Sequence, residues 1–150
     1  NVHWRGRSRS VGELANLEIG DIQDNNLHIA AQESHAERTV PLNKAAKQSI
    51  DRYLQIRPKT ALNSLFVTKT GKPLLIRNIR TAIDRYFKMA GIENAKVNDL
   101  RHTFIAHHLM SGTSLTVISK LVGHKRLSTT EKYLDFIKGV AEESVKLDEL

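Results

Sequence analysis

The sequence predicts an α+β fold that is mainly helical and carries a small antiparallel sheet. Stretches with apolar residues at helical spacing recur through most of the 150 residues, and two short alternating segments lie close together early in the chain. The 40% share of hydrophobic residues is ordinary for a globular protein of this length, which can bury a core. We therefore expect one folded unit without an interdomain linker.

The N-terminal part is expected to form a short helix and then a hairpin. Residues 11–17 repeat apolar side chains at helical spacing. Residues 27–31 alternate between apolar and polar side chains, as a half-buried strand does, and residues 38–42 form its partner after a turn over 32–36. Pro41 has no N–H to donate, so the second strand is expected at a sheet edge or to end there.

The middle of the chain predicts two helices around a short strand. Asn43 is a favourable N-cap for a helix over 44–56, which Pro58 stops. The apolar run 65–67 is expected to form a strand. A second helix is expected over 77–90, because its apolar residues fall at core spacing.

The C-terminal part predicts a series of helices. Two of them, over 99–110 and 115–122, each end near a glycine. The pattern Ser-Thr-Thr-Glu over 128–131 suits a capping box that opens a further short helix. Gly139 is expected to break the chain before a last helix over 140–150.

Charge and composition narrow the classes of function. The formal net charge of +7 favours a polyanionic partner, although a generic basic protein would show the same charge. The absence of cysteine excludes disulfides and a thiol nucleophile. No membrane-spanning apolar run and no signal peptide are visible, so we expect a cytoplasmic protein.

The segment from Asn98 to Tyr133 carries groups suited to chemistry on a phosphodiester. Arg101 is a permanent cation that binds phosphate oxygens, and His102 and His124 can donate hydrogen bonds or protons near neutral pH. Tyr133 can act as a covalent nucleophile. Each has an ordinary alternative: a surface arginine, a histidine at a helix C-terminus and a core tyrosine.

A metal site is not expected in this segment. His107 and His108 are adjacent and could join His102 or His124, but the spacing is not that of a zinc-binding HExxH motif. We expect no metal and no cofactor.

The DLRHTF and LVGH blocks, with Tyr133 nine residues after His124, resemble the catalytic half of tyrosine site-specific recombinases, the phage integrase family. The resemblance implies a catalytic domain over residues 1–150, shortened at its N-terminal side, without the family's core-binding domain and with residues 1–10 divergent or foreign. It also implies DNA cleavage and rejoining through a 3′-phosphotyrosyl intermediate, with Tyr133, Arg101 and His124 catalytic and His102 structural or poising the site.

The implied partners are double-stranded DNA and other protomers of a tetrameric synapse, which exchange their C-terminal helices. The implied location is the bacterial or archaeal cytoplasm, at the nucleoid. The basic residues expected to contact DNA are Lys69, Lys72, Arg77, Arg80, Arg85, Lys125 and Arg126.

The sequence departs from the family pattern at three positions. Asn98 stands where the family has the histidine of a His-x-x-Arg motif, and it cannot transfer protons at neutral pH. Ser10 occupies the position of the first arginine, with Arg9 as the neighbouring substitute. Glu33 occupies the position of the hairpin lysine, with His35 as the only candidate cation in that turn.

These departures leave three interpretations. The first is an impaired recombinase or integrase catalytic domain. The second is a catalytically decayed DNA-binding remnant of a mobile-element integrase. The third is an unrelated basic helical domain that binds RNA or protein, which the spacing of Arg101, His124 and Tyr133 disfavours.

Overall fold

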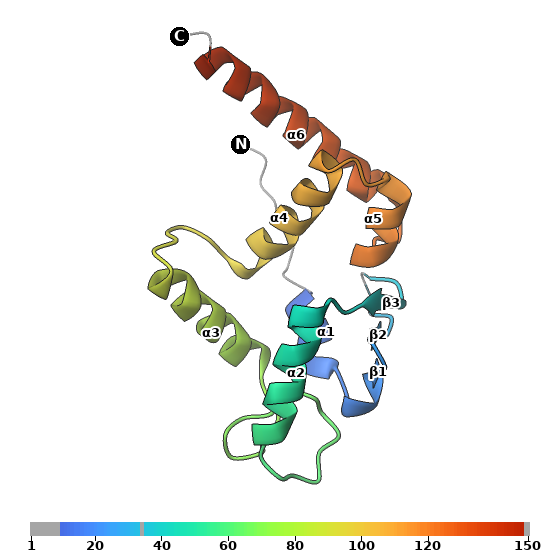
Figure 1. The fold of residues 1–150 in the computed structure, drawn as a ribbon, viewed down its shortest axis with the longest axis vertical. Coiled ribbons are helices and arrows are strands. Elements are labelled where there is room, and N and C mark those ends of the chain that lie inside the picture. Colours follow the sequence, from blue (N-terminus) through green and yellow to red (C-terminus); the bar gives the residue numbers. More distant parts are fainter. Residues whose placement is uncertain (1–9, 34, 149–150) are drawn as a thin grey trace. The chain divides into compact units, whose positions relative to one another are not determined.

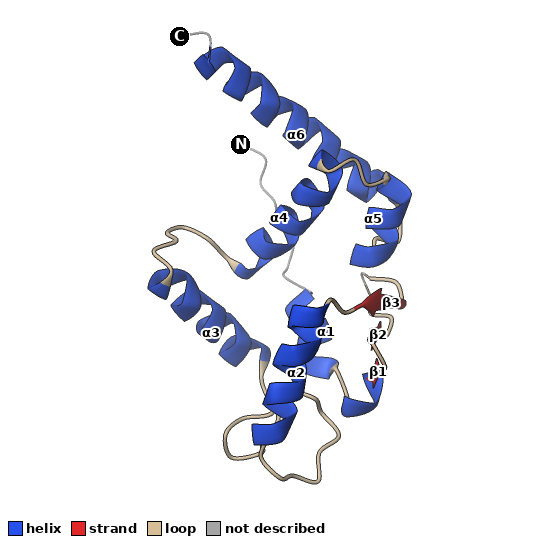
Figure 2. Cartoon of the chain, viewed as in Figure 1, coloured by secondary structure: helices blue, strands red, loops and turns tan. Residues whose placement is uncertain are grey.

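The protein is described by a computed structural model covering residues 10–33 and 35–148, with side chains for 11–33 and 35–139. Helices dominate, and a three-stranded sheet has the order β1-β2-β3, which confirms the predicted fold class (Figure 2). In chain order, the elements in Figure 1 are α1 (Ser10–Asn16), the 3₁₀ helix η1 (Ile19–Asp21), β1 (Ile22–Gln23), β2 (Asn26–Ile29), β3 (Arg38–Pro41), α2 (Lys44–Ile56), α3 (Ile76–Met89), α4 (Val97–Met110), α5 (Leu115–Val122) and α6 (Leu127–Asp148).

The contacts of the chain divide it into two compact units. The first unit comprises the chain up to Ala30 together with Thr39–Asn98, and the second comprises Ala31–Arg38 with the chain from Asp99 onward. The single catalytic domain expected from the sequence stays a prediction. No helix in the described part of the chain is both long and apolar enough to cross a membrane.

The core of the first unit forms where α1 packs against α3. Val11 of α1 and Ile79 of α3 are buried, together with Leu65 and Val67 from the segment between α2 and α3. The strand predicted over 65–67 is wrong, because this segment makes only isolated bridges. Its backbone amides have other acceptors: Leu65 donates to the Leu17 carbonyl (2.8 Å), and Val67 donates to the Tyr53 hydroxyl (3.1 Å).

Helix α2 begins and ends as the local signals predict. The Asn43 side chain accepts a hydrogen bond from the Ala46 amide at 2.8 Å, which caps the helix. After the helix, the Arg57 guanidinium holds the following loop by donating to three carbonyls, those of Leu62 (2.9 Å), Ser64 (2.6 Å) and Leu65 (3.2 Å).

The predicted hairpin is present, with one additional strand. β2 and β3 occupy most of the predicted segments, and β1, which the sequence did not predict, pairs antiparallel with β2. The turn between β1 and β2 contains Asp24 at φ 55°, a conformation that Asp tolerates better than most residues.

The second unit is built from α4, α5 and α6. Ile105, Ile118 and Val122 form its buried core, and Leu109 and Tyr133 pack against them. Helix α5 ends as predicted, at Gly123 with φ 74°. This left-handed conformation suits glycine at a helix C-terminus.

Two predictions about α6 are wrong. The helix begins at Leu127, so Ser128 lies inside it and cannot be the N-cap of a capping box. Gly139 does not break the chain, because the helix continues through it to Asp148 (Figure 1). A glycine inside a helix costs only about 1 kcal/mol relative to alanine, which a long helix tolerates.

Candidate active site

The second unit brings four predicted residues together. Arg101 and His102 are neighbours on α4, His124 follows the C-terminus of α5, and Tyr133 lies in the second turn of α6. The His102 Nδ1 atom is 2.8 Å from the Tyr133 hydroxyl, a hydrogen bond between side chains 31 positions apart. The imidazole of His102 and the phenol of Tyr133 are therefore in direct contact.

Arg101 supplies the positive charge of this cluster. Its guanidinium donates to the Val122 carbonyl at the end of α5, which orients the side chain toward the residues after α5. After burial, its charge is the next largest cause that lowers the pKa of His124, and it opposes the burial that raises the pKa of Tyr133. Because the guanidinium is always charged, an anion that binds at this cluster would meet a fixed cation.

His124 is held in its neutral form. Burial first, and then the charges of Arg101, His35 and Arg38, lower the pKa of His124 from 6.5 to about 4. Its ring stacks on Tyr133 with centroids 6.2 Å apart, and its Nδ1 atom is 2.7 Å from the Thr130 hydroxyl. At neutral pH this imidazole therefore keeps one N–H and one bare nitrogen.

Tyr133 experiences two opposing influences. Partial burial raises the pKa of its phenol, and the charge of Arg101 works in the opposite direction. The net direction is upward, so the hydroxyl keeps its proton at neutral pH. A base in contact is needed if the oxygen is to attack.

The segment 31–38 packs beside His124. His35 pairs with His124 in an antiparallel bridge, and the Ala36 amide donates to the Gly123 carbonyl at 3.0 Å. The Arg38 Nε atom donates to the Leu121 carbonyl at 2.8 Å. His35, the only candidate cation in the turn where the family has its lysine, is thus close enough to lower the pKa of His124.

Glu33, which belongs to the second unit, contacts Lys125 through its backbone. Its carbonyl accepts a hydrogen bond of 2.9 Å from the Lys125 ammonium, so a lysine from the segment after His124 reaches this turn. The Glu33 side chain itself is exposed.

The other predicted catalytic positions belong to the first unit. Asn98 lies in the first turn of α4, and Ser10 is the first residue of α1, with its side chain outside the described set. Arg9 lies outside the described residues.

The sequence interpretation missed two residues of this region. The sequence predicts only a place in a capping box for Thr130, but its side chain is fully buried against His124. The sequence predicts only a strand position for Arg38, but this side chain contacts the C-terminus of α5. Neither contact has a local sequence signal, because its partner is determined by the packing of separate elements.

Among the described residues, no group of three or more potential ligands is arranged to hold a metal ion. The exposed His107 ring instead lies edge-on to His108, with centroids 5.6 Å apart.

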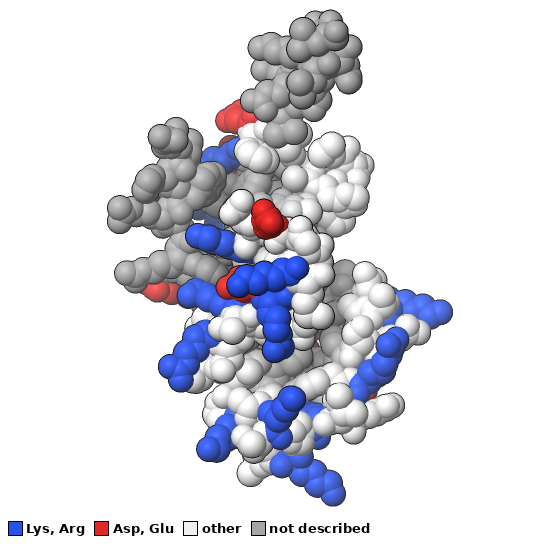
Figure 3. All heavy atoms as spheres, turned by 90° about the vertical axis from the view of Figure 1, so that its left-hand side faces the viewer, with Lys and Arg blue, Asp and Glu red and all other residues white. Residues whose placement is uncertain are grey.

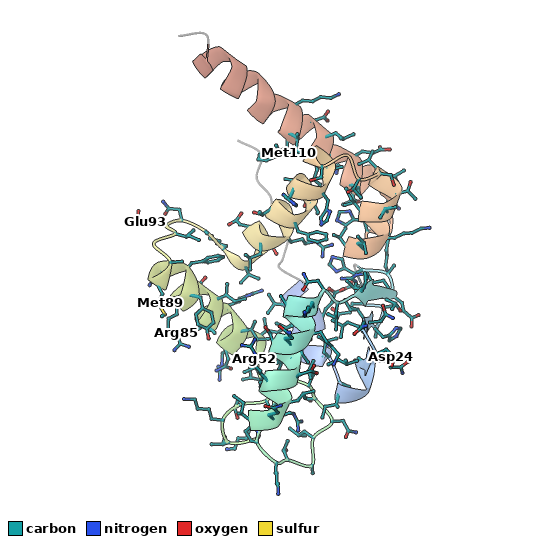
Figure 4. The ribbon with its side chains drawn as sticks, viewed as in Figure 1. Asp24, Arg52, Arg85, Met89, Glu93 and Met110 are labelled. Atoms are coloured by element: carbon teal, nitrogen blue, oxygen red, sulfur yellow. The ribbon has the colours of Figure 1, made fainter. Side chains whose placement is uncertain are left out.

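The predicted DNA-contacting residues are exposed in both units. Figure 3 shows that Lys and Arg outnumber Asp and Glu among the described residues on one face. On α3, Arg77 and Arg85 line one hollow together with Asn78, Thr81 and Ala82, and Figure 4 shows Arg85 projecting from this helix. The remaining exposed basic residues of the predicted set are Lys69, Lys72, Arg80, Lys125 and Arg126.

The profile of the Phage integrase family matches residues 9–138. The chain belongs to this family. Tyrosine recombinase XerC of Thermodesulfovibrio yellowstonii is 36% identical over 134 residues, which cover 82% of this chain and 44% of the relative. The family assignment therefore confirms the predicted resemblance to tyrosine recombinases.

Solved structures agree with this assignment to the family. The crystal structure of XerA recombinase matches with a TM-score of 0.75 and 28% identity over 82% of this chain and 47% of that one. XerH recombinase, in a post-cleavage complex with a palindromic difH substrate, has the same fold, with a TM-score of 0.72, 23% identity, and coverage of 96% and 42%. The chain spans less than half the length of these relatives.

Proposed function

We propose that the chain is the catalytic domain of a site-specific DNA recombinase or integrase that cleaves and rejoins DNA through a 3′-phosphotyrosyl intermediate. The observation that carries this proposal is the cluster of Arg101, His102, His124 and Tyr133, with the Tyr133 hydroxyl 2.8 Å from a histidine nitrogen. The family of the chain supports the same reaction.

In this mechanism Tyr133 attacks the phosphorus of the scissile phosphodiester. A bond forms between the phenol oxygen and phosphorus, and the bond from phosphorus to the 5′ oxygen breaks. The Tyr133 proton passes to His102 Nδ1, and the leaving 5′ oxygen takes a proton from water. Because the phosphodiester energy is kept in the protein linkage, the reverse attack by a 5′ hydroxyl rejoins the strand without ATP.

Arg101 and His124 stabilise the charge that develops on the non-bridging oxygens. The arginine donates to them as a permanent cation, and the neutral His124 donates through its remaining N–H. Neither needs to change its protonation state during the reaction. Asn98 is proposed to assist only as a hydrogen-bond donor, because an amide does not exchange protons at neutral pH.

We propose further that this chain reacts slowly. The family's first arginine and its hairpin lysine are replaced by Ser10 and Glu33. Loss of one transition-state donor costs on the order of 10²-fold in rate. A decayed, purely DNA-binding role is the alternative that the same substitutions favour.

A nicked suicide DNA substrate tests the first proposal, since cleavage releases a short oligonucleotide and traps the covalent product. We expect slow formation of a protein–DNA adduct that Tyr133→Phe abolishes. The double variant Ser10→Arg with Glu33→Lys is expected to react faster. Absence of adduct from both the parent chain and the double variant would leave the DNA-binding alternative.

The partner is proposed to be double-stranded DNA in the cytoplasm, at the nucleoid. The exposed basic residues motivate this, and the related XerH structure contains a DNA substrate. Each phosphate contact should add roughly 0.9 to the slope of log affinity against log salt concentration. Affinity that does not change between low and moderate salt would argue against it.

The chain is also proposed to assemble with other protomers in a tetrameric synapse through its C-terminal helix. Because α6 is continuous, an exchanged segment after Gly139 would extend directly from the helix that carries Tyr133. Deleting residues 140–150 should reduce assembly on DNA. A loss of stability with unchanged assembly would mean that this segment packs on its own chain.

A further inference from the structure

The hydroxyl of Thr130 has an unusual position for a helical threonine. Three other Ser or Thr residues inside described helices donate to the carbonyl four residues earlier: Ser49 to Ala45, Thr81 to Arg77 and Thr103 to Asp99. Ser111, just after α4, does the same to His107. The Thr130 hydroxyl instead lies 2.7 Å from His124 Nδ1, and the residue is 0% exposed.

This arrangement determines which group donates the hydrogen bond. Within the described residues, the His124 contact is the only hydrogen bond of the Thr130 side chain. If His124 Nδ1 carried the proton, the buried Thr130 hydroxyl would accept and its own proton would have no acceptor. A buried donor left unsatisfied is costly, so the hydroxyl donates and Nδ1 accepts.

The ring proton of a neutral His124 must then be on the other nitrogen. His124 is neutral at pH 7, because its pKa is lowered to about 4. No described residue makes a hydrogen bond with its Nε2 atom, so that N–H is available to a ligand beside Tyr133. A hydrogen bond to one ring nitrogen fixes what the other can do.

We propose that Thr130 is a positioning residue that holds His124 in the Nε2–H tautomer, so that Nε2–H donates to an oxygen of the scissile phosphate. The tautomer follows from the contacts of the free chain, and its catalytic consequence rests on the proposed function. The opposite tautomer would turn a bare nitrogen toward the phosphate, which repels it.

Nitrogen-15 NMR of the imidazole rings in the free chain at pH 7 tests the tautomer without any reaction. Thr130→Val keeps the shape of the side chain and removes the hydroxyl, and Thr130→Ser keeps the hydroxyl. We expect His124 to be protonated at Nε2 in the parent and in Thr130→Ser, and to become a mixture of tautomers in Thr130→Val. Protonation at Nδ1 in the parent, or an unchanged tautomer in Thr130→Val, would overturn the proposal.

The rate of covalent attachment to the nicked substrate tests the consequence. Thr130→Val should attach roughly 10- to 100-fold more slowly at unchanged DNA affinity, and Thr130→Ser should retain the parent rate. A shifted tautomer with an unchanged rate would overturn the catalytic role of Nε2–H. Failure of both the parent and the double variant Ser10→Arg with Glu33→Lys to attach would instead reject the proposed function, and the NMR result would still decide the tautomer.

Discussion

Substitution of Gly123 by alanine tests how much the contact of Arg38 with the end of α5 stabilises the segment 31–38 beside the candidate site. Gly123 has φ 74°, and a Cβ atom added there would lie 2.5 Å from Arg38 Nη1 and 2.9 Å from Arg38 Cζ. Gly123→Ala therefore both strains the backbone and displaces the guanidinium. That displacement breaks the 2.8 Å bond from Arg38 Nε to the Leu121 carbonyl.

The expected cost can be divided between these two effects. The left-handed conformation costs an alanine about 1 kcal/mol, and losing a hydrogen bond to a charged group costs about 2 kcal/mol. Gly123→Ala should therefore lower the free energy of unfolding by roughly 3 kcal/mol. Gly112→Ala is the matched control, because Gly112 has φ 81° and no atom within 4 Å of the added Cβ.

Urea unfolding followed by circular dichroism measures both changes. We expect Gly112→Ala to cost about 1 kcal/mol, the strain alone. In an Arg38→Ala background, the cost of Gly123→Ala should fall to the same value. If Gly123→Ala cost no more than Gly112→Ala, or cost the same with and without Arg38, the assigned role of the guanidinium would be wrong.

Three further changes test other contacts. The His124 pKa of about 4 lies below 6.5, so the unfolded chain takes up the proton first and the free energy of unfolding falls as pH drops from about 6.5 toward 4. Urea unfolding at pH 7 and 4.5 measures this decrease in the free energy of unfolding, which should be smaller in His124→Gln than in the parent. An identical decrease in both proteins would contradict the burial of this imidazole. Arg57→Lys should lower the free energy of unfolding by about 2 kcal/mol, because an ammonium cannot reproduce the fork to three carbonyls; an unchanged urea midpoint would show that these bonds contribute little. Gly139→Ala should raise the free energy of unfolding by about 1 kcal/mol, because alanine favours a helix more than glycine and no atom lies within 4 Å of the added Cβ. A drop in helicity would instead reveal a bend at this position.

Elements that depend on interactions within a few residues could be predicted from the sequence, and elements that depend on distant partners could not. Helix α2 was predicted from Asn43 and Pro58, which act within a few residues, and its bounds are confirmed. The strand over 65–67 was wrong because strand pairing depends on a distant partner, and here the amides found the Leu17 carbonyl and the Tyr53 hydroxyl.

The same distinction holds at the candidate site. Residue types and spacing sufficed to select Arg101, His124 and Tyr133 from one continuous segment. The contact of Arg38 with Leu121 joins residues 83 positions apart, and no pattern along the chain indicates it. The hydrogen bond between His102 and Tyr133 depends likewise on how α4 and α6 pack, so the sequence alone undervalued His102.

The continuity of α6 has a mechanical consequence. The helix runs on for 15 residues after Tyr133, which at about 1.5 Å per residue is a rod of roughly 22 Å. A helix resists bending and twisting much more than a loop, so a force applied at Asp148 would be transmitted to the turn that carries the phenol. Pulling or rotating the far end would lengthen or misalign the contact between the Tyr133 hydroxyl and His102 Nδ1. The continuous helix thus couples the far end of α6 to the position of the Tyr133 hydroxyl.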